Sequence, residues 1–165
     1  MKKSLFLAIV LATAAALMTS CVITPVGPSA PSPIASATDM SYSVTTGGTG
    51  SFSNWFSQST YTNDGVDAAE SGSISASSST WFQITVSGYN YIGFYWKVSS
   101  ESFDHLTVSV DGSASDYISG AVDWSFKEIY LGGGTHTIKW TYSKDSSVST
   151  GLDTGWVDQI SVYNY

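Results

Sequence analysis

The stretch Tyr91-Ile92-Gly93-Phe94-Tyr95-Trp96-Lys97-Val98 decides the fold class of this 165-residue chain. Its even positions are large and apolar, whereas its odd positions hold tyrosine, glycine and lysine. Such an alternation with period two is typical of a β-strand that buries one face and exposes the other. The same pattern recurs in the segments 81–86, 105–110, 137–142 and 159–162.

Turn sequences separate these predicted strands, namely Ser87-Gly88, Asp111-Gly112 and Gly132-Gly133-Gly134. No segment beyond the N-terminal region repeats its apolar residues with the period of a helix. The pattern therefore predicts an all-β domain with eight or more short strands. That number favours an antiparallel two-sheet β-sandwich (a jelly roll) over a single meander. Trp96 and Trp140 occupy apolar even positions of their predicted strands, on the side that faces the core. We therefore expect both side chains to pack in the core rather than to bind a ligand.

The charge balance excludes two classes of partner. The chain has six lysines, no arginine and thirteen carboxylates, which gives a formal net charge of −7. Binding to nucleic acid phosphates needs a surplus of basic residues, because affinity comes largely from counterion release. The composition therefore argues against nucleic acid as a partner, and against a polybasic membrane-surface protein.

Residues 1–20 are typical of a lipoprotein signal peptide. Lys2 and Lys3 precede an apolar stretch that is too short to span a bilayer comfortably. Met18-Thr19-Ser20-Cys21 resembles the lipobox of bacterial lipoproteins, in which the cysteine becomes the lipidated N-terminus. The alternative is ordinary secretion with a free thiol. Cys21 is the only cysteine, so an intramolecular disulfide is excluded.

Residues 21–40 contain all four prolines and many serines and alanines, which is typical of an extended linker. We expect the folded β-sandwich domain to span residues 41–165. Val22, rather than Asp, follows the predicted lipidated cysteine. By resemblance to lipoproteins this favours the outer membrane where a cell has two membranes. The sequence thus predicts an exported, lipid-anchored protein of the cell envelope.

Asp158 is the most informative charged residue. It shares parity with Ile160 and Val162, so the alternation predicts that its side chain points into the core. An unpaired buried carboxylate is costly unless a cation or hydrogen-bond donors compensate it. Ca²⁺ is a suitable cation, because its preferred ligands are carboxylate and carbonyl oxygens. The alternative is that loop amides donate hydrogen bonds to Asp158.

Several blocks in this order resemble a jelly-roll module of bacterial cell-surface proteins that is similar to MAM and cleaved-adhesin domains. These blocks are the segments 64–72, 96–101, 110–112, 118–120, 140–145 and 155–158. The resemblance implies a β-sandwich with a structural cation near the last strand, held by Asp158 with Asp67 as a partner. It also implies adhesion, or binding of a glycan or surface protein, rather than a reaction.

Aromatic residues offer a second route to a binding function. Sugar rings stack on exposed aromatic faces while nearby polar groups bind their hydroxyls. Tyr91 and Tyr95 are candidates because the alternation places them on the solvent face of their strand. The other candidates are Trp55 and Trp124, which lie beside polar or turn residues, and Asp123, which adjoins Trp124. The alternative for each ring is packing within the protein.

We find little support for catalysis in the sequence. His105 and His136 are the only histidines, and no nucleophile-elbow or zinc-protease motif is present. We therefore expect a noncatalytic, calcium-stabilised binding module for a glycan or a cell-surface protein. A self-associating structural envelope protein is the first alternative, and a polysaccharide-degrading enzyme is the second.

The lipid anchor gives the first testable prediction. We expect Cys21→Ser to move the protein from the membrane fraction to the soluble fraction, because several acyl chains are needed for stable anchoring. Cell fractionation and metabolic labelling with a radioactive fatty acid measure this directly. Equal membrane association of the wild type and the variant would contradict the prediction.

Overall fold

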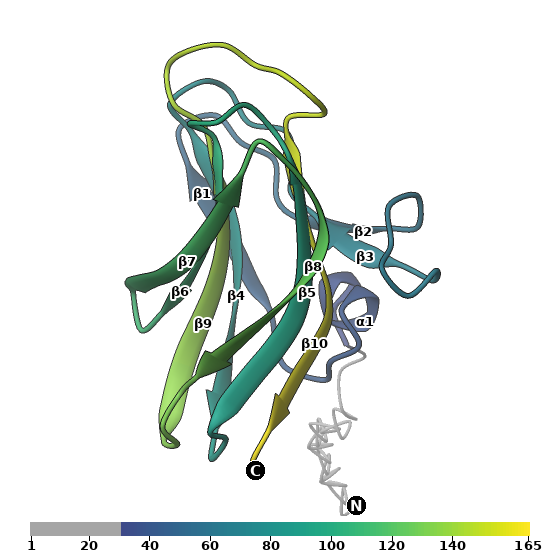
Figure 1. Ribbon diagram of the computed structural model, residues 1–165, viewed down its shortest axis with the longest axis vertical. Coiled ribbons are helices and arrows are strands. Elements are labelled where there is room, and N and C mark those ends of the chain that lie inside the picture. Colours follow the sequence, from purple (N-terminus) through teal and green to yellow (C-terminus); the bar gives the residue numbers. More distant parts are fainter. Residues whose placement is uncertain (1–30) are drawn as a thin grey trace, which may run out of the picture.

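A computed structural model describes residues 31–165 as two five-stranded antiparallel sheets that face each other (Figure 1). In the first sheet the strand order is β1 (Thr45–Thr49), β4 (Ser79–Ser87), β9 (Thr135–Ser143), β6 (His105–Val110) and β7 (Ser113–Ser119). In the second sheet it is β2 (Phe56–Gln58), β3 (Ala68–Glu70), β10 (Thr154–Tyr163), β5 (Tyr91–Ser99) and β8 (Ala121–Tyr130). The predicted fold class is confirmed.

The strand connections are those of a jelly roll. Eight consecutive strands, β3 to β10, form the two four-stranded layers β3-β10-β5-β8 and β4-β9-β6-β7. This pairing joins two Greek keys into one sandwich. The short strands β2 and β1 extend one edge of each layer. The predicted turn Asp111-Gly112 joins β6 to β7, and both residues have positive φ, as a two-residue hairpin turn requires.

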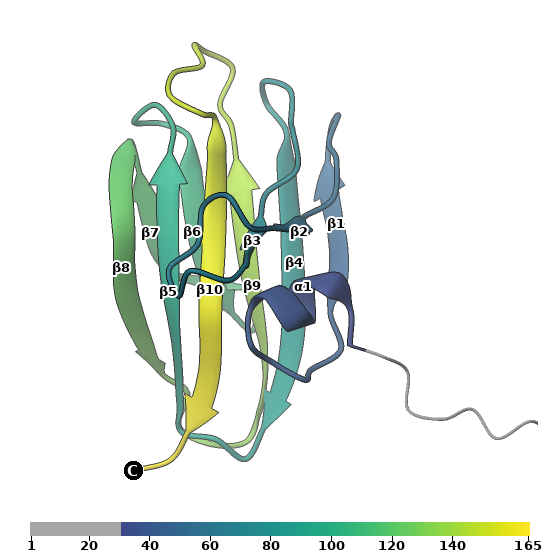
Figure 2. The same ribbon diagram turned by 90° about the vertical axis from the view of Figure 1, so that its right-hand side faces the viewer.

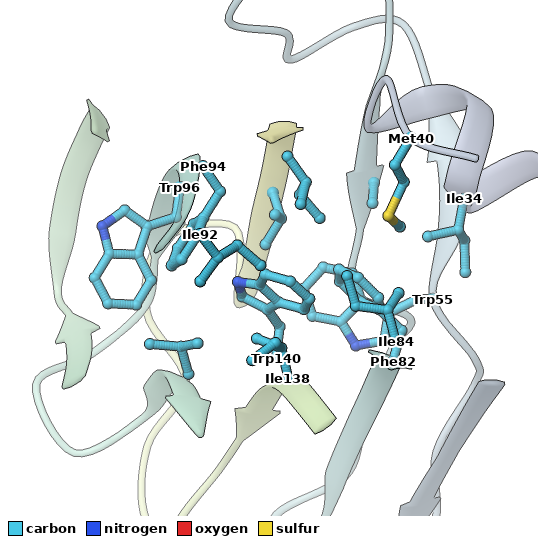
Figure 3. Close-up of a cluster of buried hydrophobic side chains, with 14 of the residues drawn as sticks. Ile34, Met40, Trp55, Phe82, Ile84, Ile92, Phe94, Trp96, Ile138 and Trp140 are labelled. Atoms are coloured by element: carbon cyan, nitrogen blue, oxygen red, sulfur yellow. The ribbon is translucent and has the colours of Figure 1, made fainter. Parts of the chain in front are cut away.

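Aromatic rings fill the space between the sheets (Figure 3). The fully buried Trp140 of β9 stacks on Phe82 of β4, with ring centroids 4.8 Å apart. Phe94 of β5, in the opposite sheet, meets Trp140 edge-on at 5.3 Å. Trp96 is also buried, so the structural role predicted for it and for Trp140 is confirmed.

Helix α1 (Pro33–Ala37) closes the side of the sandwich that the short strands β2 and β3 leave open (Figure 2). Ser32 caps the helix by accepting a hydrogen bond from Ala35 N at 3.1 Å. Ile34 and Met40 are buried in the core cluster. No helix in residues 31–165 is long and apolar enough to cross a membrane.

The predicted linker boundary is therefore wrong at its C-terminal end, because the folded domain already includes residues 33–40. Proline here starts a helix, a position where its missing N–H costs nothing. The Thr38 carbonyl then accepts a hydrogen bond from Ile160 N at 2.9 Å, which fixes the segment against β10. The predicted signal peptide and Cys21 lie outside the described residues.

This boundary can be tested by stability measurements. We expect Ile34→Ala to lower the free energy of unfolding by about 2–4 kcal/mol, as truncation of a buried isoleucine does. The exposed Ser36→Ala, on the same helix, is the control and should change it by less than about 0.5 kcal/mol. Urea unfolding followed by tryptophan fluorescence measures both. An Ile34→Ala variant as stable as the wild type would show that α1 does not belong to the folded unit.

Candidate functional site

The outer face of the second sheet carries a continuous aromatic surface. On β5, Tyr91 and Tyr95 alternate with the buried Phe94 and Trp96, so they point away from the core. Their cross-strand partners on β8 are Tyr130 and Phe126 respectively. We call this surface the aromatic face, and it comprises Tyr91, Tyr95, Phe126, Tyr130, Tyr163 and Tyr165.

Tyr91 lies at the centre of the wider end of the aromatic face. Its ring centroid is 5.2 Å from that of Tyr130, 5.9 Å from that of Tyr163 and 4.9 Å from that of Tyr165. Towards the other end, the rings of Tyr95 and Phe126 lie 5.3 Å apart. The Phe126 ring lies across Gly93, where a Cβ atom would approach it to 2.8 Å. Glycine is therefore needed for this close approach.

Polar groups border the aromatic face on β8. The carboxylate of Glu128 accepts hydrogen bonds from the hydroxyls of Tyr163 and Tyr165. Burial of the hydroxyl and the hydrogen bond to Glu128 raise the pKa of Tyr163. At the far end, Lys97 and Asp123 form an ion pair with an N–O distance of 2.5 Å.

The ion pair of Lys97 with Asp123 lies at a β-bulge between β5 and β8. Two residues of β8, Asp123 and Trp124, lie opposite the single residue Lys97 of β5. A groove of about 280 Å³ opens beside the ion pair, with Tyr61, Lys97, Asp123 and Leu152 among its lining residues. Trp124, the other residue of the bulge, is half-buried and is not among the residues that line the groove.

Four of the five predicted ligand-binding residues thus lie on β5 and β8, while the fifth, Trp55, does not belong to the site. Trp55 is only 3% exposed and packs edge-on against Phe82 in the core. It precedes β2 in an irregular segment, where no alternation marks the buried side. Phe126 and Tyr130 were missed, although they alternate along 121–130, because sequence does not show which strand pairs with β5.

Asp158 is buried as predicted, but it points to the opposite side of the sheet. Its partner on β5 is Tyr95, which faces outward, whereas the neighbouring Val157 pairs with Trp96 of the core. The strand register shifts between Asp158 and Ser161, and Gln159 takes a left-handed conformation there with a φ of 50°. This bulge reverses the alternation, so the even-numbered residues Ile160 and Val162 after it face inward, whereas Asp158 before it faces outward.

The loop that precedes β3 covers Asp158. The Asn63 N–H donates to one carboxylate oxygen at 2.7 Å, and the other oxygen has no hydrogen-bond partner among the described residues. The side chain is 1% exposed, and burial raises its pKa. The alternative of amide donors therefore accounts for one oxygen but leaves the other unsatisfied.

Asp39 and Asp64, rather than the predicted Asp67, come together with Asp158. Carboxylate oxygens of these three residues all lie within 4.8 Å of one another. Asp67 is half-buried outside this cluster. Asp39 was missed because it falls in the segment interpreted as a linker. The hydrogen bond between Thr38 and Ile160 places it beside β10.

No lysine in residues 31–165 compensates these three carboxylates. This part of the chain has four lysines, and three of them form ion pairs: Lys97 with Asp123, Lys127 with Asp116 and Lys144 with Asp153. The fourth, Lys139, lies 4.7 Å above the ring of Trp81. Burial together with the charges of Asp64 and Asp67 raises the pKa of Asp39. An all-oxygen, strongly acidic set of this kind suits a hard divalent cation such as Ca²⁺.

Neither ring nitrogen of His136 is free to act as a catalytic base. Nδ1 pairs with a carboxylate oxygen of Asp111 at 2.8 Å, and Nε2 is hydrogen-bonded to the carbonyl of Gly133. The hydrogen bond to Asp111 raises the pKa of His136. These contacts tie the β8–β9 loop to the β6–β7 hairpin, which is a structural role.

Neither a protein-family model nor a curated protein matches this sequence. Solved structures do match in fold. The K1 cleaved adhesin domain of Lys-gingipain from Porphyromonas gingivalis W83 superposes with a TM-score of 0.56 at 11% identity, covering 74% of this chain and 90% of that one. The K2 cleaved adhesin domain of Lys-gingipain gives 0.55 at 13% identity, covering 81% and 94%.

The secreted serine protease VesC from Vibrio cholerae gives a TM-score of 0.54 at 16% identity, over 59% of this chain. The chain spans only 22% of the length of VesC. At these identities the similarity concerns the fold. This chain therefore shares the β-sandwich architecture of the cleaved adhesin domains, as the resemblance of its sequence blocks predicts.

Proposed function

We propose that this chain is a noncatalytic binding module of the cell envelope that holds a glycan on the aromatic face. The observation that carries the proposal is the outward row of rings on β5, on β8 and at the C-terminal end of the chain beyond β10. The exposed fraction is 52% for Phe126, 67% for Tyr130 and 88% for Tyr165. A monomeric protein rarely leaves such a contiguous set of rings in water without a binding role.

The mixture of groups on this face favours a sugar over a purely apolar partner. Each tyrosine combines an apolar ring with a hydroxyl, and Glu128 and Asp123 add acceptors for sugar hydroxyls at the two ends. Lys97 neutralises Asp123, whereas Glu128 forms no ion pair with a lysine of residues 31–165. The ligand is accordingly a neutral glycan, since an acidic polysaccharide would meet like charge.

Display at the envelope rests on the predicted lipidation of Cys21. The predicted signal peptide would export the chain, and lipid on Cys21 would anchor it with the sandwich outside the membrane. The fold that the chain shares with the cleaved adhesin domains supports a surface role.

We further propose that Asp39, Asp64 and Asp158 hold a structural Ca²⁺. The unsatisfied buried oxygen of Asp158 supports this proposal. Burying a carboxylate without a partner costs several kcal/mol, and a divalent cation removes that cost. A bound ion would join the N-terminal segment, the loop before β3 and strand β10.

Glycan binding is tested on the mature chain that begins at residue 21, with Cys21→Ser to prevent lipidation. We expect it to bind neutral oligosaccharides on a glycan array. Tyr95→Ala and Phe126→Ala should each lower the affinity for the strongest array glycan by about 5- to 30-fold, or 1–2 kcal/mol, as loss of a stacking ring does. Isothermal titration calorimetry measures the affinity.

The control for this experiment is Tyr117→Ala, which removes a ring that is 59% exposed on the other sheet. It should leave the glycan affinity unchanged. Concentration-dependent assembly without glycan binding would instead support a self-associating envelope protein. Release of reducing ends from a polysaccharide would show an enzyme.

The calcium site is tested by thermal melting of the same chain. Millimolar Ca²⁺ should raise the melting temperature and a chelator should lower it, because a ligand bound only by the native state stabilises it by about 2.7 kcal/mol at a concentration of 100 Kd. Asp158→Asn and Asp64→Asn should each reduce this response, whereas Asp67→Asn, outside the cluster, should retain it. Equal responses of the Asp158→Asn and Asp67→Asn variants would refute the assignment.

A further inference from the structure

A second acidic cluster lies where two loops meet at one end of the sandwich. One loop joins β5 to β6 and the other joins β9 to β10, and Figure 2 shows both at the same end of the strands. Glu101 and Asp104 come from the first loop, and Asp145 comes from the second. Carboxylate oxygens of these three residues lie within 4.8 Å of one another.

Asp104 distinguishes this cluster from a group of solvated surface acids. It is completely buried, with 0% of its surface exposed. One carboxylate oxygen accepts a hydrogen bond from Asp145 N at 3.0 Å, and the other has no hydrogen-bond partner among residues 31–165. A carboxylate with an unsatisfied buried oxygen is costly unless a cation compensates it.

The neighbouring lysine donates its hydrogen bonds to groups other than Asp104. The ammonium group of Lys144 is bound to the carboxylate of Asp153 and the hydroxyl of Ser149. Tyr142 also donates to Asp153, at 3.3 Å. One ammonium therefore faces four carboxylates, those of Glu101, Asp104, Asp145 and Asp153.

The remaining hydrogen bonds leave ligand atoms free. Asp145 uses one carboxylate oxygen to accept from the N–H and the hydroxyl of Ser147, so its other oxygen is available. Glu101 accepts from Phe103 N with one oxygen at 2.9 Å and makes only a long contact of 3.4 Å to Ser102 with the other. Asp104 and Asp145 thus each offer a carboxylate oxygen without a hydrogen bond, and Glu101 offers one that makes only the long contact.

We propose that Glu101, Asp104 and Asp145 form a second binding site for a divalent cation of the Ca²⁺ class, separate from the site at Asp158. The oxygen-only ligand set and its position between two loops suit calcium, which accepts irregular geometry and completes its shell with water and carbonyl oxygens. The ion links the β5–β6 loop to the β9–β10 loop.

The ion also connects to the groove beside the aromatic face. Leu152, in the β9–β10 loop, lines that groove, and its N–H donates to the Ser99 hydroxyl at 2.9 Å. A cation at Asp145 therefore holds the loop that forms one wall of the groove. This assignment does not depend on whether the groove binds a glycan.

The experiment counts calcium ions on the mature chain with Cys21→Ser, using calorimetric titration of the chelator-treated protein with CaCl₂ alone. We expect two ions for this chain, one for Asp104→Asn, one for Asp158→Asn and none for the double variant. Glu101→Gln, which changes a half-exposed residue, is the second variant if Asp104→Asn fails to fold. Asp116→Asn, which lies outside both clusters, is the control and should bind two.

Two further measurements distinguish a role of Asp104 in cation binding from a purely structural role. In chelator, Asp104→Asn should melt no lower than the unsubstituted protein, because it removes an uncompensated buried charge. Ca²⁺ should slow chymotryptic cleavage of the Leu152–Asp153 bond about tenfold or more in the Asp158→Asn variant, but not in Asp104→Asn, because a bound ion suppresses local opening of the loop. A single ion that Asp158→Asn abolishes, or two ions retained by both Asp104→Asn and Glu101→Gln, would overturn the proposal.

Discussion

The contact of Trp140 with phenylalanines from both sheets is the constraint on which the sandwich depends. Phe82 stacks on the indole from the neighbouring strand, and Phe94 meets it from the opposite sheet. Aromatic pairs of this geometry bury large areas and prefer defined orientations, so they fix how the two layers lie over each other. The space between the sheets also holds polar groups, since Tyr142 is buried in it and the ion pair of Lys127 with Asp116 joins β8 to β7 of the opposite sheet.

The bulge at Gln159 determines what lies outside that core on β10. One extra residue allows Ile160 and Val162 to face inward while Asp158, on the same strand, faces outward beneath a loop. The uncovered part of the same face, on β5 and β8, displays the aromatic rings. A single sheet therefore presents a covered carboxylate, Asp158, and an open aromatic surface on the same face.

The sequence predicts the architecture well because alternation of apolar residues is a local property, and it is strong in β4, β5, β6 and β9. Features that depend on pairing are harder to predict. The burial of Asp158 was expected, but on the wrong face, since sequence does not reveal a bulge. Trp55 and Asp39 lie in irregular segments without a period. Asp104 could have been found, because it shares parity with Leu106 and Val108, one step before the predicted strand.

The two buried carboxylates without a hydrogen-bond partner on one oxygen, Asp104 and Asp158, make the stability of the fold depend on its surroundings. If a divalent ion compensates each of them, the free energy of unfolding depends on the free calcium concentration: the domain is least stable where calcium is scarce and most stable where it is abundant. The same acidic groups that oppose compaction without the ion then strengthen the folded domain.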